Sequence, residues 1–228
     1  GFLILAFYQV IGGWCLHYLI DACMGKGLIT DTAQLGAYFD GFVTNGERVV
    51  ANQIGFLLLT AGVIVFGVQK GIERISKILM PALFLLMLLL IVRGLTLPGA
   101  WAGVEFMFKF QPQDFNSSSL LNALGFAFFS LSLGSGTMMN YGSYLSDKVN
   151  LPTSVAWISF LAVMAAILGG LMIMPAVFAF GLNPSAGPGL TFVTMPAVFA
   201  QLPFGQGFAI LFYICLVVAA LTSAISIL

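Results

Sequence analysis

The sequence predicts an all-α, polytopic membrane protein, and three observations lead to this fold class. Apolar residues make up 60% of the chain and charged residues only 7%, a composition typical of membrane proteins. The charges gather in short stretches that separate six segments long enough to cross a bilayer as helices. One of these segments carries a run of serine and glycine at its middle. The spans are expected at about 1–20, 49–69, 78–96, 119–145, 154–182 and 206–228.

The first span, residues 1–20, contains no Asp, Glu, Lys or Arg. Residues 21–48 hold acidic and basic side chains among glycines, so we expect them to form an aqueous loop. The second span, 49–69, is again uncharged, and a tight basic connection at 70–77 follows it. These alternations of apolar and charged stretches predict helices that cross the membrane and short connections outside it.

The third span, 78–96, has a proline near its start and Arg93 near its far end, where a long cationic side chain can reach the interface. Residues 97–118 contain Glu105, Lys109 and Asp114 and are expected to form a second long loop. The charges place this segment in water.

The fourth span lies inside residues 115–146, which carry no charge. Its middle, Ser130 to Gly136, combines poor helix formers with two glycines. Because backbone polar groups in lipid need partners, an unwound turn at this depth is typical of secondary transporters, which use it to bind substrates and ions. The alternative is a Gly/Ser face that packs against another helix.

After Lys148 no Asp, Glu, Lys or Arg occurs. The remaining residues divide into the span 154–182, a Gly/Pro loop at 183–205 and the span 206–228. We interpret the uncharged loop as a re-entrant plug. The short connections carry more Lys and Arg than Asp and Glu, so the positive-inside rule places them in the cytoplasm. We expect a multi-pass protein of the inner (plasma) membrane whose residue 1 lies on the cytoplasmic side.

The last span presents oxygen atoms on one face. Ala219, Thr222 and Ser223 are spaced i, i+3 and i+4, which brings one carbonyl and two hydroxyls together. A hard monovalent cation prefers oxygen ligands, as hard divalent cations do. In the alternative interpretation, the hydroxyls bond only to carbonyls of their own helix.

Four motifs follow one another along the chain: Lys70-Gly71-Ile72-Glu73-Arg74, Phe128-Phe129-Ser130-Leu131-Ser132-Leu133-Gly134, Tyr141-Gly142-Ser143-Tyr144 and Ala219-Ala220-Leu221-Thr222-Ser223. In these motifs the chain resembles the neurotransmitter:sodium symporters, specifically their bacterial amino-acid transporter branch. The resemblance implies a broken-helix, inverted-repeat sodium symporter fold. It also implies that the chain is one partial transporter domain holding the third to eighth of about twelve helices. Gly1 opens directly into an apolar run, which agrees with an internal fragment of a larger protein.

The resemblance also implies roles for individual residues. Tyr8 matches the tyrosine that holds the substrate carboxylate, and Phe129 matches the aromatic gate. The implied substrate-binding residues are Ile4, Tyr8, Phe129, Ser130, Ser132, Ser135, Ser223 and Ile227. The implied sodium site consists of Ala219, Thr222 and Ser223, and Ser130 matches a position of a second sodium site. Ser143 and Tyr144 match the cytoplasmic gate.

The chain departs from the family pattern at two places. Phe126 follows Gly125 where the family usually has glutamine, and the positions of an ion-binding asparagine and an anion-site residue fall near Leu161 or Ala162 and Ala165. Because these side chains cannot coordinate an ion, we predict one sodium ion per cycle and no chloride requirement.

The expected function is therefore sodium-coupled symport of an amino acid or related amine by alternating access, with no enzymatic activity. The expected partners are the amino-acid substrate and the lipid bilayer. The net charge of zero gives no electrostatic reason to expect nucleic-acid binding. One alternative couples the same fold to protons with His17 as the relay. The less favoured alternative is an integral-membrane enzyme, which would need a nucleophile with a base, or a metal cluster, whereas the chain has one His and its spans have no carboxylate.

Overall fold

The computed structural model describes residues 1–65, 73–112, 115–134, 136–143, 145, 149–182, 184 and 187–227. Within these residues the regular structure is helical and no strand occurs. The long helices are α1 (Phe2–Cys23), α3 (Gly46–Val65), α4 (Glu73–Leu95), α8 (Leu151–Ala179) and α10 (Gly205–Ile227). The shorter ones are α2 (Thr32–Val43), α5 (Ala100–Phe108), α6 (Ser117–Ser130), α7 (Thr137–Ser143), the π-helical turn η3 (Leu190–Thr194) and α9 (Met195–Ala200).

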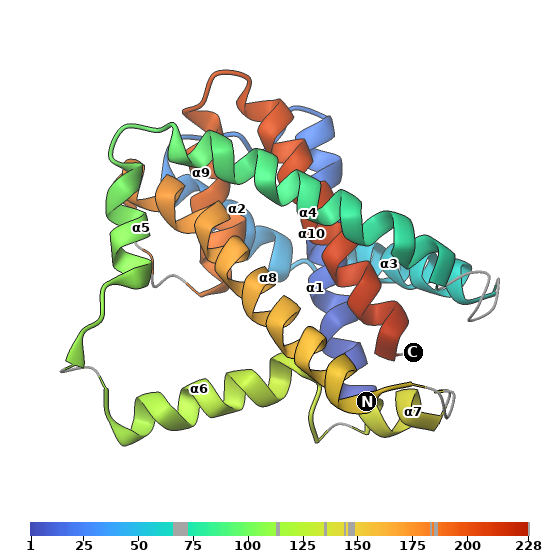
Figure 1. Cartoon of the computed structure of the whole chain (residues 1–228). Coiled ribbons are helices and arrows are strands. Elements are labelled where there is room, and N and C mark those ends of the chain that lie inside the picture. Colours follow the sequence, from blue (N-terminus) through green and yellow to red (C-terminus); the bar gives the residue numbers. More distant parts are fainter. Residues whose placement is uncertain are drawn as a thin grey trace.

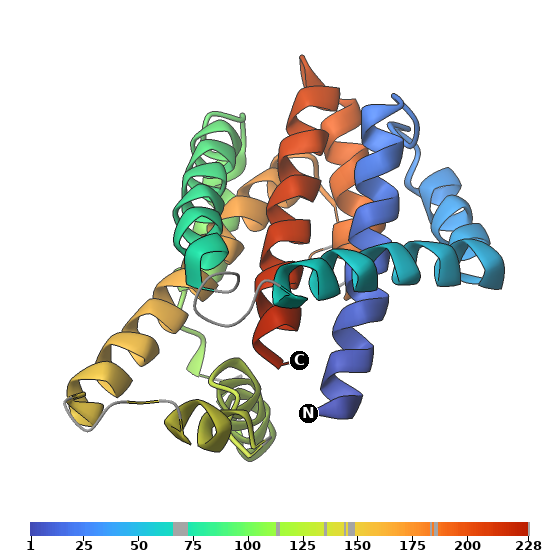
Figure 2. The same ribbon diagram turned by 90° about the vertical axis from the view of Figure 1, so that its right-hand side faces the viewer.

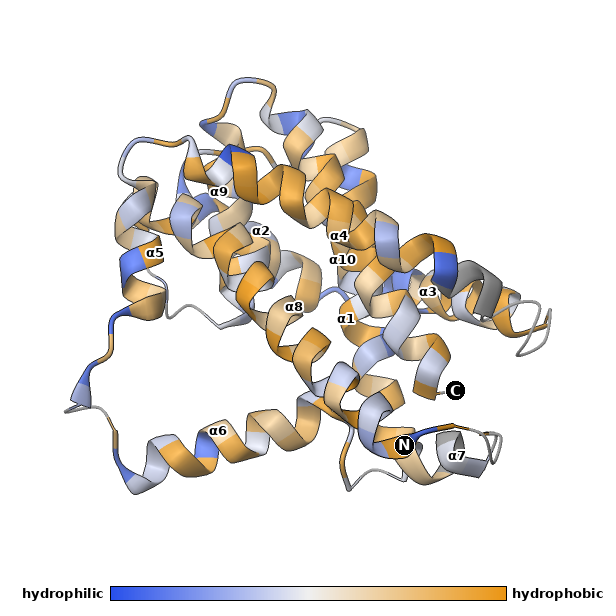
Figure 3. Ribbon diagram, in the orientation of Figure 1, coloured by the Kyte–Doolittle hydropathy of each residue, from blue (hydrophilic) through white to orange (hydrophobic). Residues whose placement is uncertain are grey.

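Five of these helices, α1, α3, α4, α8 and α10, are long and apolar enough to cross a membrane. Their ribbons are mostly apolar along their length, whereas the hydrophilic residues gather mainly at helix ends and connections (Figure 3). A helix that is apolar all round is typical of a membrane span. The chain is therefore a multi-pass membrane protein with an all-α fold.

Helices α1 and α10 lie side by side at the centre of the bundle, and α3 crosses them (Figures 1 and 2). Small residues make this crossing close. A Cβ atom on Gly13 would lie 2.9 Å from the backbone nitrogen of Gln53, and one on Gly12 would overlap the Phe56 ring. On the other side of α10, α4 packs against both α10 and α8, and α5 lies along α8.

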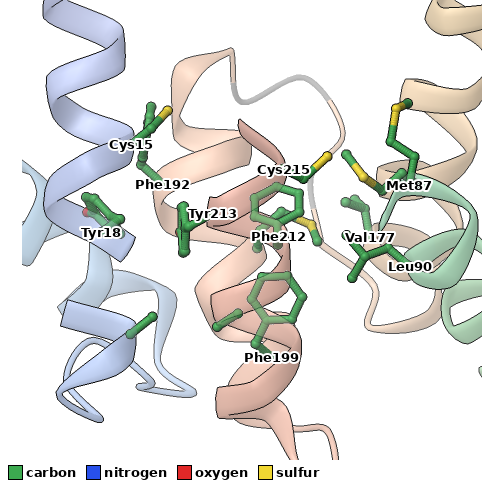
Figure 4. Close-up of a cluster of buried hydrophobic side chains, with 14 of the residues drawn as sticks. Cys15, Tyr18, Met87, Leu90, Val177, Phe192, Phe199, Phe212, Tyr213 and Cys215 are labelled. Carbon is green, nitrogen blue, oxygen red and sulfur yellow. The ribbon is translucent and has the colours of Figure 1, made fainter. Parts of the chain in front are cut away.

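The core lies where α10 meets α1 on one side and α4 and α8 on the other (Figure 4). Aromatic and sulfur-containing side chains dominate it. Its buried members include Cys15, Tyr18, Met87, Leu90, Val177, Phe192, Phe199, Phe212, Tyr213 and Cys215. The segment Leu190–Ala200, which comprises η3 and α9, belongs to the predicted re-entrant loop and contributes Phe192 and Phe199 to this core.

The two long stretches that we expected to be aqueous loops each contain a helix, which corrects that expectation. Helix α2 begins after Asp31, whose carboxylate accepts a hydrogen bond from the Ala33 backbone at 2.9 Å. Its buried residues, Leu35 and Phe42, are seven positions apart and so share one face. Helix α5 fits against α8 through Gly103, where a Cβ atom would lie 2.5 Å from the Met174 carbonyl oxygen.

The uncharged segment predicted as a broken span consists of two helices. Asn116 caps the start of α6 by accepting from the Ser119 backbone at 2.9 Å. Helix α6 ends at Ser130 and α7 begins at Thr137. Both helices lie at the end of the bundle where the two chain ends are found (Figure 1). The break therefore sits beside the first turns of α1 and the last turn of α10.

Candidate functional site

The break after α6 has a defined geometry. The Ser132 backbone donates to the Phe129 carbonyl at 3.1 Å, and the Leu133 backbone donates to the Phe128 carbonyl at 2.9 Å. This pair of bonds is the Schellman motif that ends many helices. Its left-handed position is normally glycine, yet here Ser132 occupies it with φ of 54°. A side chain in this conformation costs about 1–2 kcal/mol, and such strain is concentrated at functional sites.

The same geometry exposes polar backbone at the end of α6. The Schellman bonds satisfy the carbonyls of Phe128 and Phe129. Among the turn and cap bonds of the described residues, none reaches the carbonyls of Ser130 and Leu131. The C-terminus of a helix also carries a partial negative charge. This end of α6 can therefore attract an ammonium group or a metal cation.

A cavity of about 350 Å³ lies at this break. It is lined by residues of α1, α6, the connection to α7, the first residue of α7 and the last turns of α10. The lining residues are Ile4, Tyr8, Phe126, Phe128, Phe129, Ser130, Ser132, Leu133, Thr137, Ser223, Ser226 and Ile227. Hydroxyl groups and aromatic or aliphatic side chains thus share one cavity, the arrangement that a small amphipathic ligand requires.

The aromatic rings of Tyr8 and Phe129 bridge α1 and α6 at this cavity. Their centroids are 6.5 Å apart and the rings are nearly parallel, with an angle of 3° between the planes. Phe7 contacts the edge of Tyr8 at a centroid distance of 6.0 Å. These contacts bring the broken helix to α1 through side chains.

The structure gathers most of the predicted substrate residues in one place. The lining contains Ile4, Tyr8, Phe129, Ser130, Ser132, Ser223 and Ile227. Ser135 and Tyr144 lie outside the described residues, and Ser143 is the last residue of α7. The substrate and gate roles of these residues stay predictions.

The sequence reasoning missed Phe126, Phe128, Leu133, Thr137 and Ser226 as cavity residues. Two of them carried a readable signal. Ser226 follows Ser223 by three positions, and Phe126 precedes Phe129 by three, so each shares a helix face with a predicted site residue. Leu133 and Thr137 carried no periodic signal, because Leu133 lies within the unwound connection and Thr137 is the first residue of α7.

The oxygen atoms of the predicted sodium site lie close together in α10. The hydroxyls of Thr222 and Ser223 each donate to the Ala219 carbonyl at 3.0 Å. This is the intrahelical bonding that Ser and Thr often make in membrane helices, and it leaves lone pairs on both hydroxyl oxygens. Among the described residues, His, Cys, Asp and Glu form no cluster that could hold a metal ion, so the ligand atoms that this face itself offers are neutral oxygens.

Two other predictions concern residues outside this cavity. His17, the proposed relay of the proton-coupled alternative, does not line it and instead lies 3.2 Å from Asp21 near the end of α1. Leu161, Ala162 and Ala165 also do not line it, so the described residues of α8 offer no ligand to the cavity.

Comparison with known proteins places this geometry in context. The model of the sodium:neurotransmitter symporter family matches residues 32–228. The uncharacterized sodium-dependent transporter YhdH of Bacillus subtilis is 48% identical over 225 residues, which cover 99% of this chain. An uncharacterized sodium-dependent transporter of Haemophilus influenzae is 35% identical over the whole chain.

A solved structure is similar as well. The crystal structure of MhsT in complex with L-phenylalanine superposes with a TM-score of 0.86 and 42% sequence identity, and it covers 100% of this chain. The match extends over 52% of that structure, and the two relatives above are each covered over 50% of their length. The chain thus spans about half the length of the curated relatives it matches.

Proposed function

Because this chain belongs to the sodium:neurotransmitter symporter family, we propose that the protein containing it takes up an amino acid or related amine together with sodium by alternating access. The proposal concerns transport and involves no covalent chemistry. The chain would supply the third to eighth helices of the transporter. Elements that complete the site would come from the other half of the protein.

The observation that carries this proposal is the cavity at the helix break. A zwitterion needs a donor at its carboxylate and acceptors at its ammonium group, because buried groups left unpaired are costly. Tyr8 offers a phenolic donor, while the hydroxyl of Ser132 and the carbonyls at the end of α6 offer acceptors. The negative end of the α6 dipole further favours the ammonium group.

The cavity walls support a large apolar or aromatic amino acid as the substrate. Phe126, Phe128 and Phe129 contribute aromatic surface from the C-terminal end of α6, and Ile4 and Ile227 add aliphatic surface. MhsT, whose fold this chain shares, was crystallised with L-phenylalanine. We therefore propose L-phenylalanine as the first substrate to test.

The face formed by Ala219, Thr222 and Ser223 is our proposed sodium site. The relatives that match this chain are described as sodium-dependent transporters, and three oxygen atoms meet on this face beside the cavity. Ser130 is the matched hydroxyl for a second sodium site. A single sodium ion is the simpler proposal, because no side chain with a ligand atom occupies the matched positions in α8.

The experiment is uptake of radiolabelled L-phenylalanine by the intact protein reconstituted in liposomes. An inward sodium gradient should drive accumulation, and an equal potassium gradient should not. Replacing Tyr8→Phe should raise the half-saturating substrate concentration by at least about tenfold, since a charge-assisted hydrogen bond is lost.

A pH gradient imposed without sodium separates the proton-coupled alternative. Accumulation driven by that gradient alone would contradict sodium coupling. Unchanged kinetics in Tyr8→Phe would contradict the proposed substrate pose while leaving sodium coupling intact. Leu121→Ala, an exposed position of α6 outside the cavity, serves as the matched control.

A further inference from the structure

A cluster of three polar side chains, His17, Asp21 and Tyr38, joins the end of α1 to α2. The Nε2 atom of His17 lies 3.2 Å from Oδ2 of Asp21, and the Tyr38 hydroxyl donates a hydrogen bond to the same oxygen. Both members of the α1 pair are largely buried, with 13% and 11% of their side chains exposed. One carboxylate oxygen of α1 therefore meets a donor from each of the two helices.

Aromatic stacking surrounds this group. The His17 ring lies flat on Phe42 of α2, with centroids 3.9 Å apart and an angle of 9°. Tyr18 meets Tyr38 and Phe42 edge-on at 6.1 and 6.3 Å. Side chains around Asp21 thus make several of the contacts that attach α2 to α1.

A further charged group near this cluster is Arg48, at the start of α3, whose positive charge acts on both His17 and Tyr38. Burial, together with the hydrogen bond to Asp21, raises the pKa of Tyr38. The phenol therefore keeps its proton throughout the physiological range, and it remains a donor to the carboxylate.

Helix α2 also contacts the buried segment Leu190–Ala200. Phe39 stacks on Phe192 of η3, with centroids 5.6 Å apart and planes at 3°. Trp14 of α1 meets both rings edge-on, at 5.4 Å and 5.7 Å. On its far side, η3 is bonded to α10, because the Tyr213 hydroxyl donates to the Thr191 carbonyl at 3.2 Å.

We propose that Asp21 and Tyr38 form a clamp that fixes α2 on α1, and that α2 in turn holds the segment Leu190–Ala200 in the bundle. The segment depends on such support, because it begins with a π-helical turn and includes a helix of only six residues. Short elements of this kind open locally unless their neighbours hold them. The clamp is a positioning device distinct from the transport cavity.

Hydrogen–deuterium exchange of the intact purified protein tests the clamp, with mass spectrometry following the amides of 190–200. Tyr38→Phe removes the donor and keeps the ring, and Asp21→Ala removes the acceptor. Each should speed exchange in this segment by about tenfold, as expected for the loss of a hydrogen bond to a charged group. Because both remove the same contact, the double variant should exchange no faster than Asp21→Ala.

Two further variants separate the clamp from general damage. Asp21→Asn retains an acceptor oxygen and should restore part of the protection that Asp21→Ala loses. Asp40→Asn changes an exposed carboxylate on α2 and should leave exchange unaltered. Unchanged exchange in Tyr38→Phe and Asp21→Ala would overturn the proposal, as would an equal increase in α5 and α8. Amide exchange needs no transport, so the result stands whether or not sodium-driven uptake is found.

Discussion

Thr222 and Ser223 show how one pair of hydroxyls can serve two purposes. Both donate to the Ala219 carbonyl, so the helix itself satisfies their protons. Their oxygens can still face a cation, because a hydroxyl has two lone pairs. The hydrogen bonds would then orient those lone pairs, which is the preorganisation that an ion site needs.

Replacing Thr222 and Ser223 together by alanine should raise the sodium concentration for half-maximal uptake by at least about tenfold. That change corresponds to about 1.4 kcal/mol, a small part of losing two oxygen ligands from a dehydrated ion. Uptake measured against sodium concentration in the reconstituted intact protein checks it. A well-expressed double variant with unchanged sodium dependence would remove these residues from the proposed site.

The aromatic side chain at position 126 should set substrate preference. Phe126 lines the cavity and is largely exposed in this structure, so a bound apolar side chain would cover part of its ring. Truncating it to alanine should weaken competition by L-phenylalanine by about tenfold, because that apolar contact is lost. Competition by glycine should change much less. The wild-type protein is expected to prefer large apolar or aromatic amino acids, and glycine as its best competitor would refute this.

At the scale of helices, close approach of backbones shapes this bundle. Helix α5 can lie along α8 because Gly103 has no side chain at the crossing beside Met174 and Pro175. The expected clash of a Cβ atom is with backbone, which cannot rotate away. Helix α1 meets α3 in the same manner at Gly13.

Gly103→Ala should therefore lower the free energy of unfolding by about 1–3 kcal/mol, the usual cost of overpacking. Gly36→Ala in α2 is the matched control, because nothing lies within 4 Å of the point that its Cβ atom would occupy. There the higher helix propensity of alanine should stabilise the protein slightly. Thermal unfolding of the purified protein distinguishes the two, and equal melting temperatures would contradict the close-packing argument.

The sequence predicted the elements that depend on hydropathy and missed those that depend on packing. The long apolar helices and the break at Ser130 follow from local composition. Helix α2 was missed because its charges and glycines indicated a loop, although Leu35, Phe39 and Phe42 carry a helical period. Most of the substrate residues predicted through the family motifs line one cavity, and their roles stay predictions. The contact of His17 and Tyr38 with the same Asp21 carboxylate was not predicted, because it joins α1 to α2 and no local sequence pattern reveals that these helices touch.

For the whole molecule, charge balance bears on ion stoichiometry. An uncompensated charge deep in a membrane is costly. A transporter that lacks the second sodium ion is therefore expected to lack the chloride ion that would balance its charge. At the positions that the family resemblance assigns to these two ions, Phe126 and the apolar residues near Leu161 and Ala165 carry no side-chain ligand atom.

We therefore expect one sodium ion per transport cycle and no chloride requirement. Uptake by the reconstituted intact protein should be unchanged when gluconate replaces chloride, and its sodium dependence should have a Hill coefficient near one. A coefficient approaching two, or a clear loss of uptake in gluconate, would show that the other half of the protein restores the missing ligands.

The contact between α1 and α10 has a consequence for biosynthesis. The Gln206 side chain donates to the Ala22 carbonyl at 3.0 Å across 184 residues of sequence. At ribosomal rates of about 5–20 residues per second, α10 is synthesised roughly 10–40 seconds after α1. During that interval Gln9, which is buried in the finished bundle, must stay in the membrane or its insertion machinery without α10. In nascent chains arrested before residue 205, a photocrosslinking side chain at position 15 should therefore react with lipid or the insertion machinery, and release of the full chain should bring its crosslinks into the bundle.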